Sequence, residues 1–295
     1  MAGNVTTQGS VYSPEVLADA VGAGFPGMVA LYGTRAAIIN TQMPYGREHL
    51  DAKVKIPYFN LVGEMEDVDP DGGELSAAEL TGQVEEAPVK HSGKGIEFTQ
   101  WARLNPTNPY AEGQRQIVEA TRRRADKALV DAALDPTGWS AYTIDRLSYF
   151  IDYDGITEAM AALGDEGLSE RPVAMIAHSR TVKDMYQVKD ATGRPMLVEG
   201  GPGGLMVIAP LGIAVIPSDK IPVDLTANTT TSALLWENSL AFWINGNPTI
   251  RQESNARKDS DGEYVHIYHA THRFLRRNQM SKPGVVHLKH KIKVG

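Results

Sequence analysis

A long acidic hairpin is the sequence feature that most constrains how this chain can fold. The residue pattern predicts extended legs at 53–62 and 96–104, and the segment between them is rich in acids and contains glycines. With about 20 residues each, the legs could reach ~66 Å at ~3.3 Å per residue. A compact body of about 250 residues is only roughly 46 Å across. Because an isolated two-stranded ribbon is barely stable in water, we expect this hairpin to rest on another molecule.

The composition indicates a soluble protein with a substantial core. Apolar residues make up 42% of the 295 positions, and the net charge of −7 excludes a surface that is basic throughout. The chain has no cysteine, which excludes disulfides, thiol nucleophiles and cysteine-bound zinc. The first ten residues show no secretory pattern, and proline and glycine interrupt the longest uncharged run, at 200–218. We therefore expect a cytoplasmic protein that does not span a membrane.

Two charge runs of opposite sign occupy different parts of the chain. Between residues 64 and 86 there are nine acids and no base: Glu64, Glu66, Asp67, Asp69, Asp71, Glu74, Glu79, Glu85 and Glu86. After Glu263 there is no acid, and the tail carries seven bases and five of the eight histidines. Either run alone is typical of a solvated face. Together they suggest that the two runs meet, within one molecule or between copies.

Helical periodicity is clearest at 109–134, where Asn108 can cap and a proline occupies the first turn. A helix of this length spans nearly ~40 Å, enough to run along one side of the body. The consecutive Arg122, Arg123 and Arg124 sweep about 200° around it. They are either part of a solvated helix face or an inward patch that faces DNA, and the sequence favours neither.

The remaining pattern alternates short helices and strands, which indicates a mixed α+β fold. Helices are expected from an Asp154 cap to Leu163 and from a Ser179 cap to Lys189. Strands are expected at 173–177, 205–209, 213–216 and 263–275, with 234–236 and 241–244 as a further pair. The first 50 residues are predicted to be an arm with little core of its own.

Motifs for enzyme or metal chemistry are weak. The segment 67–72 opens like a calcium loop, but the twelfth position is Ala78 and the required glutamate comes one residue late. On a strand, His266 and His272 share one face and His269 points to the other, so the three cannot converge on a metal. The glycine run at 200–204 lacks the lysine of a phosphate loop. We expect no catalytic residue, no metal site and no cofactor.

Several stretches, in their order along the chain, carry a resemblance to one protein family. They are KVKIP at 53–57, LTGQVEEAPVKHSGKGIEFTQWA at 80–102, the helix at 108–135, PVAMIAHSRTVKDMYQVKDATGRPML at 172–197, LGIAVIPSDKIP at 211–222 and the final segment from 240 to VVHLK at 285–289. In this order they resemble the major capsid proteins of tailed bacteriophages, which have the Hong Kong 97-type fold. The joint match is more specific than any single stretch.

The resemblance implies five segments. They are an N-terminal arm at 1–48, an E-loop hairpin at 49–104, the spine helix of the P-domain at 105–137, an A-domain at 138–255, and a P-domain sheet return with the C-terminal segment at 256–295. It also implies that the hairpin and the arm lie on neighbouring subunits. Some relatives crosslink an E-loop lysine to a neighbour, but the acidic tip here has no lysine, so no crosslinking is expected.

The function implied by the resemblance is structural. Copies of the chain would form the hexamers and pentamers of an icosahedral shell in a virion, assembled in the host cytoplasm around double-stranded DNA held by non-specific contacts. A separate scaffolding protein, a portal and a decoration protein are the implied partners. The shell of an encapsulin compartment has the same fold and is the first alternative. A soluble hydrolase or metal-dependent enzyme is a more distant one.

The two charge runs suggest how neighbouring copies meet. We expect the acidic loop, with Glu64, Glu66, Asp67, Asp69, Asp71 and Glu74, to dock on a basic surface of an adjacent copy formed by Arg273, Arg276 and Arg277. Exposed ion pairs contribute only ~0–1 kcal/mol each and are screened by salt. The charges should therefore set register and orientation, while buried apolar area supplies most of the cohesion.

Overall fold

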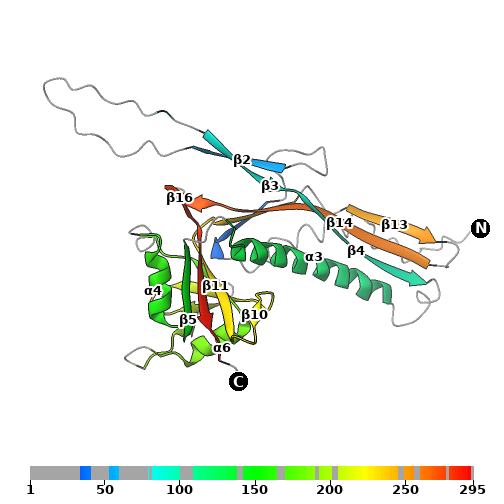
Figure 1. Ribbon diagram of the computed structural model, residues 1–295. Helices are drawn as coiled ribbons and strands as arrows, with labels where there is room; N and C mark the ends of the chain where they lie inside the picture. Colours follow the sequence, from blue (N-terminus) through cyan, green and yellow to red (C-terminus); the bar gives the residue numbers. More distant parts are fainter. Residues whose placement is uncertain are drawn as a thin grey trace, which may run out of the picture.

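Two large β-sheets and one long helix form the body of the protein, and a two-stranded hairpin projects from it (Figure 1). The computed structural model describes residues 34–40, 53–59, 79, 82–99, 109–137, 142–164, 170–189, 193–200, 205–244, 249–255, 260–276 and 279–293. Most of the acidic loop, including the six acids from Glu64 to Glu74 expected to dock, lies outside these residues. The architecture is the mixed α+β class that the sequence predicted.

The long helix, α3 (Pro109–Leu134), has the bounds that the sequence predicted. Its buried residues include Ile117, Ala125, Leu129 and Ala133, which recur every four or eight positions and so form one apolar stripe. Asp135 and Pro136 follow the last helical residue, and proline cannot continue a helix. The apolar stripe packs against strands of both sheets, so α3 joins the two parts of the body.

The five-stranded sheet is built around β14 (Ser260–Arg273), the longest described strand. On one edge β14 pairs with β12 (Leu240–Ile244) and β13 (Thr249–Asn255), and on the other edge it pairs with β4 (Lys90–Thr99). All three pairings are antiparallel. β1 (Ala37–Asn40) adds to β12 in parallel. Figure 1 shows α3 running along this sheet.

The eight-stranded sheet lies between α3 and two shorter helices, α4 (Tyr153–Ala161) and α6 (Ser179–Gln187). Its main path has the order β5-β17-β11-β6-β9-β8-β7, and β10 pairs with β11. The strands are β5 (Thr143–Phe150), β6 (Ala174–Ala177), β7 (Leu197–Glu199), β8 (Met206–Ile208), β9 (Ile213–Pro217), β10 (Val223–Asp224), β11 (Thr229–Leu235) and β17 (Val285–Lys291). Helices α4 and α6 pack on one face, and α3 packs on the other.

The hairpin consists of β2 (Lys53–Phe59) and β3 (Gly82–Pro88), which pair in antiparallel register. Val54 and Ile56 are buried at its base, and Lys53 and Lys55, which alternate with them along the strand, are exposed. With Ala87 they pack against Trp243 and neighbouring small residues of the five-stranded sheet. This small third cluster holds the base of the hairpin on the body. A further two-stranded ribbon joins β15 (Leu275–Arg276) to β16 (Gln279–Pro283).

The returning leg of the hairpin differs from the prediction. It is extended from residue 82 and not only from residue 96, and its second half, β4, pairs with β14 of the same chain. Only the first half pairs with β2. The free part of the hairpin is therefore shorter than expected, because backbone hydrogen bonds tie residues 90–99 to the chain's own sheet.

Two predicted helix caps are wrong by one or two residues. Helix α4 is capped by Asp152 and not by Asp154, because Asp152 has an extended backbone and its carboxylate accepts a hydrogen bond of 2.7 Å from the Gly155 amide. Helix α6 is capped by His178 and not by Ser179, since Nδ1 of His178 accepts from the Arg180 amide at 3.1 Å. Imidazole is an unusual cap, and propensity rules do not point to it.

The expected pairing of 234–236 with 241–244 is also wrong. The first stretch ends β11 in the eight-stranded sheet, and the second belongs to β12 in the five-stranded sheet. The sheets also cross the predicted segment boundaries, since 138–255 and 256–295 each contribute strands to both sheets. Within the predicted arm, Ala36 and Ala37 lie in the main core beside β12, so this part has a core contact in its own chain. The division into five segments stays a prediction.

Candidate functional site

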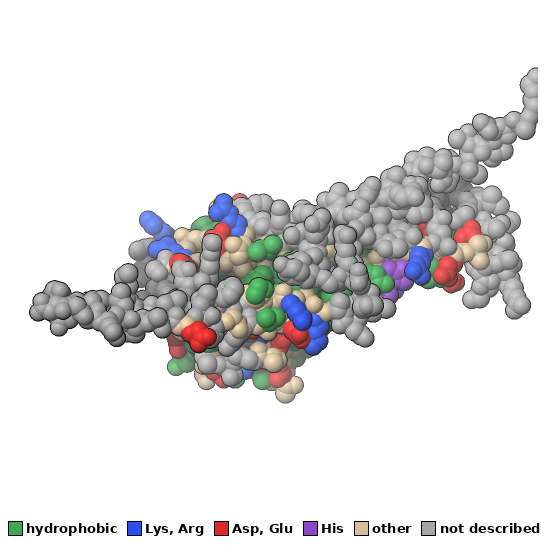
Figure 2. All heavy atoms as spheres, turned by 90° about the horizontal axis from the view of Figure 1, so that it is seen from above, with side chains coloured by type: hydrophobic (Ala, Val, Ile, Leu, Met, Phe, Trp, Pro, Cys, Tyr) green, Lys and Arg blue, Asp and Glu red, His purple; other side chains and the backbone are tan. Residues whose placement is uncertain are grey.

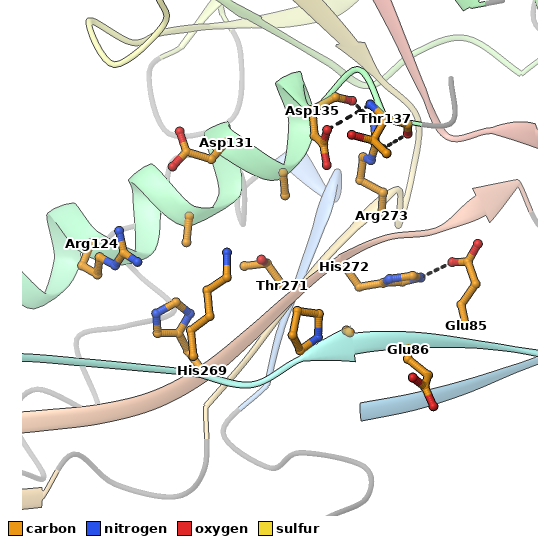
Figure 3. Close-up of a pocket in the computed structure, with 15 residues that line it drawn as sticks. Glu85, Glu86, Arg124, Asp131, Asp135, Thr137, His269, Thr271, His272 and Arg273 are labelled. Atoms are coloured by element: carbon orange, nitrogen blue, oxygen red, sulfur yellow. Dashed lines mark hydrogen bonds and ion pairs between the residues drawn. The ribbon is translucent and has the colours of Figure 1, made fainter. Parts of the chain in front are cut away.

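A groove of about 690 Å³ lies at the base of the hairpin, where β3 and β4 run beside β14 near α3 (Figure 3). We call it the basal groove. Helix α3 contributes Arg124 and Asp131, and Asp135 follows its last residue. Strand β3 contributes Glu85 and Glu86, β4 contributes Lys90, and β14 contributes His269, His272 and Arg273. Elements far apart in the sequence thus bring charged groups of both signs to one place.

Most acids of the basal groove have a basic partner within the chain. Glu85 lies 3.1 Å from Nε2 of His272, as Figure 3 shows. Glu86 accepts a 2.5 Å hydrogen bond from Lys53, which lowers the pKa of its carboxyl. Asp131 accepts one of 3.0 Å from Lys127. These acids are partly or fully exposed, so the pairs are worth little individually, but Lys53 and Lys127 offset the charges of Glu86 and Asp131.

Arg273 is engaged inside its own chain. Its guanidinium donates hydrogen bonds to the carbonyl oxygens of Asp135 and Thr137, the second at 2.9 Å, just beyond the end of α3. A cation at this position also complements the negative end of the helix dipole. Burial lowers the pKa of Arg273. Arg273 was expected to bind acids of a neighbouring copy. In the structure its guanidinium instead binds carbonyl oxygens at the C-terminal end of α3.

The other two predicted docking arginines are not tested by the structure. The backbone of Arg276 pairs with Gln279 in the β15–β16 ribbon, but its side chain and all of Arg277 lie outside the described residues. The acids Glu64 to Glu74 lie outside them as well. Their docking on Arg276 and Arg277 remains a prediction.

Lys90 and Arg124 are the bases of the basal groove that sequence reasoning did not place there. Neither has an acidic partner among the residues that the structure describes. Arg124 donates from Nε to Oγ of Ser92 at 3.1 Å, and Ser92 in turn hydrogen-bonds Nε2 of His269 at 3.0 Å. The sequence left open whether Arg124 belongs to a solvated helix face or to an inward patch that faces DNA, and the structure shows it in contact with β4 and lining the groove.

His269 is a buried imidazole close to Arg124 and Lys90 in the basal groove. The residue is completely buried and its ring stacks on Phe242 at 5.4 Å between centroids. Burial, reinforced by the charges of Arg124 and Lys90, lowers the pKa of His269 from 6.5 to about 4. The imidazole is therefore neutral at physiological pH, which suits a ring packed against a core phenylalanine.

This pKa predicts acid sensitivity of the free chain. Because the native state binds a proton at His269 less readily than the unfolded state does, stability falls as the pH drops from about 6.5 to about 4. The contribution is at most about 3 kcal/mol. Denaturant unfolding measured at pH 7 and pH 4.5 should show that the free energy of unfolding falls less in His269→Gln than in the wild type. Equal losses in the two proteins would contradict the assignment.

The three tail histidines do not converge. His269 faces the basal groove and α3, while His266 hydrogen-bonds His91 of β4 at 3.1 Å and His272 contacts Glu85. Burial lowers the pKa values of His266 and His272 as well. Among the described residues no group of three potential metal ligands is brought together.

The three consecutive arginines of α3 have separate partners. Arg122 and Arg123 both pair with Glu119, at 3.6 and 3.1 Å, while Arg124 contacts Ser92. On the face drawn in Figure 2, blue and red side chains of the described residues lie next to one another. These pairs fit the solvated-face interpretation for Arg122 and Arg123. The DNA-facing role of the three arginines stays a prediction.

One serine–histidine pair bears on the hydrolase alternative. Oγ of Ser232 and Nε2 of His290 are 2.9 Å apart, and Nδ1 of His290 contacts the carbonyl oxygen of Lys291. Both side chains are buried, with 0% and 1% of the residue exposed, so a substrate cannot reach them. Burial also lowers the pKa of His290. The pair holds β11 against β17 and is not a nucleophile–base pair.

Within the described part of the chain no helix has the length and apolar character needed to cross a membrane.

Comparison with protein families decides what the chain is. A family model described as phage capsid protein matches residues 83–275, which include β4, α3, most of the eight-stranded sheet and all of β14. The chain belongs to the phage capsid protein family. This capsid protein has no match among curated proteins.

Solved structures with the same fold come from phages and from an encapsulin. The capsid of Ralstonia phage GP4 has a TM-score of 0.66 at 10% identity, covering 92% of this chain and 91% of that one. A chain of Mycobacterium phage Adephagia has a TM-score of 0.63 at 12% identity, covering 89% and 91%. The SrpI encapsulin of Synechococcus elongatus has 0.58 at 15% identity, covering 79% and 81%.

The comparisons confirm the predicted fold and the structural role. The capsid protein has the Hong Kong 97-type fold, and its function is to build a shell from copies of itself. A structural family accounts for a chain in which the sequence shows no motif for catalysis.

Proposed function

We propose that copies of this capsid protein close, as hexamers and pentamers, into an icosahedral shell that encloses the double-stranded DNA of a tailed phage. The observation that carries the proposal is the family match over residues 83–275. The hairpin supports it, because β2 pairs with β3 alone among the described strands and the hairpin contacts the body at its base, through a small apolar cluster and the Glu85–His272 contact. A ribbon held at one end needs a neighbour to order the rest.

The proposal includes partners that the chain itself does not identify. A scaffolding protein would guide assembly in the host cytoplasm, a portal would admit the DNA, and a decoration protein could bind outside. Packaged DNA would be held by non-specific contacts, with Arg122, Arg123 and Arg124 as candidates. The protein is proposed to have no enzymatic activity and no cofactor.

An encapsulin shell is the second candidate, favoured by the SrpI encapsulin structure, which has a TM-score of 0.58. Particles purified from cells that carry the gene distinguish the two. After nuclease treatment they would be opened and analysed for double-stranded DNA and for protein. Protected DNA is expected. A particle filled with a cargo protein and free of DNA would favour the encapsulin, and a stable species near 32 kDa at micromolar concentration would contradict both shells.

Charge reversal tests the docking predicted from the tail. If the acidic loop contacts Arg276 and Arg277 of an adjacent copy, Arg276→Glu with Arg277→Glu should impair particle formation at low salt, because like charges would then face each other. The effect should shrink at high salt, where exposed charges are screened. Particles that form as in the wild type at both salt concentrations would refute this contact.

A further inference from the structure

The basal groove has two bases, Lys90 and Arg124, that have no acidic partner among the residues that the structure describes. Lys90 lines the groove from β4 and Arg124 lines it from α3, so the two cations come from different elements. The His269 imidazole lies near both cations: burial mainly lowers its pKa to about 4, and the charges of Arg124 and Lys90 lower it further. Arg124 uses Nε to contact Ser92, and no hydrogen bond from its two terminal nitrogens occurs within the described residues.

The acids that line the same groove do not pair with these two bases. Glu86 and Asp131 pair with Lys53 and Lys127, Glu85 contacts the His272 imidazole, and Asp135 accepts from the Thr137 amide near the guanidinium of Arg273. Arg273 itself is directed to the end of α3. Lys90 and Arg124 therefore form a niche for an anion, because neither has an acidic partner among the described residues.

We propose that the basal groove of one copy receives carboxylates of the acidic loop, residues 64–74, of a neighbouring copy, with Lys90 and Arg124 as the contacts. This inference rests on the proposed docking of the loop between copies and names a receptor for it. The loop is the complementary partner that the chain itself offers, with six acids and no base between residues 64 and 74. Carboxylates paired with Arg and Lys form charge-assisted hydrogen bonds, which are the stronger kind.

The loop of the same copy is a less suitable occupant. Seven paired positions separate the base of the hairpin, at Lys53 and Pro88, from its far end, at Phe59 and Gly82. At about 3.3 Å per residue, the loop begins roughly 20 Å from the base. Figure 1 shows β2 and β3 leading away from the body. To fill its own groove the loop would have to run back along the whole hairpin.

Duplex DNA is also a less suitable occupant than a peptide loop. Glu85, Asp131 and Asp135 line the groove and would repel a dense row of phosphates. A peptide can place individual carboxylates beside Lys90 and Arg124 and set neutral residues opposite the acids. The mixed lining therefore fits a segment with spaced charges.

A charge-swap experiment tests the contact between copies. The receptor variant carries Lys90→Glu and Arg124→Glu, and the loop variant carries lysine in place of Glu64, Glu66 and Asp67. Each variant alone should need roughly tenfold more protein than the wild type for half-maximal assembly at low salt. A 1:1 mixture should recover assembly, because each receptor then meets a complementary loop on the other variant. Light scattering and electron microscopy give the readout.

Three controls make the outcome decisive. A chain that carries both sets of changes restores pairing under either model, so it checks that all variants can fold. Reversal of two exposed bases of α6, Arg180→Glu with Lys183→Glu, matches the receptor variant in net charge and should leave the concentration for half-maximal assembly unchanged. Lys90→Glu alone, at an exposed strand position, tests the niche without disturbing the Arg124–Ser92 contact and should raise that concentration too.

Several results would overturn the proposal. If only the doubly swapped chain assembles and the mixture does not, the loop fills the groove of its own copy. If the receptor variant assembles like the wild type, the niche is not a contact, and if it assembles normally but loses packaged DNA, the niche serves the duplex. Assembly of the wild type in the same buffer tests the shell function itself, so failure of that function is recognised separately.

Discussion

Replacing Val54 by aspartate should detach the hairpin from the body and abolish shell assembly while both large sheets stay folded. Val54 is fully buried in the cluster that holds the hairpin, against Trp243 and Ala270. Burial of a valine contributes about 1.5–3 kcal/mol, and a carboxylate in its place would be desolvated without a partner at a cost of several kcal/mol. The cluster is too small to absorb this cost, so the hairpin should separate.

Hydrogen exchange provides the main measurement for Val54→Asp. Amides of β2 and β3 should lose protection, while those of β11 and α3 should keep it. Val84→Asp is the matched control, since Val84 lies in the same hairpin with 58% of its surface exposed and no core contact to lose. Protection of β2 should be unchanged in that control. If Val54→Asp also forms normal particles with a protected hairpin, the anchoring role of the cluster is wrong.

The elements that the sequence predicted correctly are those with a strong local pattern. Helix α3 has an apolar stripe, a proline in its first turn and a proline after its end, so its bounds need no tertiary information. Strand β14 is rich in β-branched and aromatic residues, and its predicted start differs from the observed one by three residues. The local sequence of each of these two elements is therefore sufficient to predict its type and approximate bounds.

The errors concern contacts between distant parts of the chain. Which sheet the strands at 229–235 and 240–244 join depends on α3 and on β17, which lies some 50 residues further along. The parallel addition of residues 37–40 to β12 joins positions about 200 apart, and a four-residue strand gives little warning of it. The N-caps Asp152 and His178 were not predicted for a local reason, because several adjacent residues in each segment have side chains that can cap a helix.

The basal groove shows the same limit for the site. The sequence displayed the acidic loop and the basic tail, but it gave no sign that Arg273 would turn to the end of α3. The sequence also could not show that Arg124 would donate a hydrogen bond to Ser92, 32 positions earlier, and line the same groove as Lys90. One available signal was the alternation in β14, which placed His269 apart from His266 and His272. The structure bears that out through their different partners.

The long helix α3 packs against both sheets. We expect that truncating Phe242 would weaken this packing most. Phe242 lies on β12, is completely buried, and belongs to the same cluster as Leu129 of α3 and Ile176 of β6. Phe242→Ala removes the ring and leaves a cavity among these elements, which for such substitutions costs about 3–5 kcal/mol. A domain of this kind has only about 5–15 kcal/mol in total.

Because the cavity from Phe242→Ala would lie where both sheets meet α3, we expect the loss to appear in a single cooperative transition and not in one sheet alone. Urea unfolding should show a lower midpoint by circular dichroism and by tryptophan fluorescence together. Leu225→Ala, at a position with 63% of its surface exposed, should change the midpoint little. Two separate transitions in Phe242→Ala would mean that the sheets are independent units and that α3 does not couple them. A coupled body, by contrast, can hold the hairpin base at a fixed place, which a shell of identical copies requires.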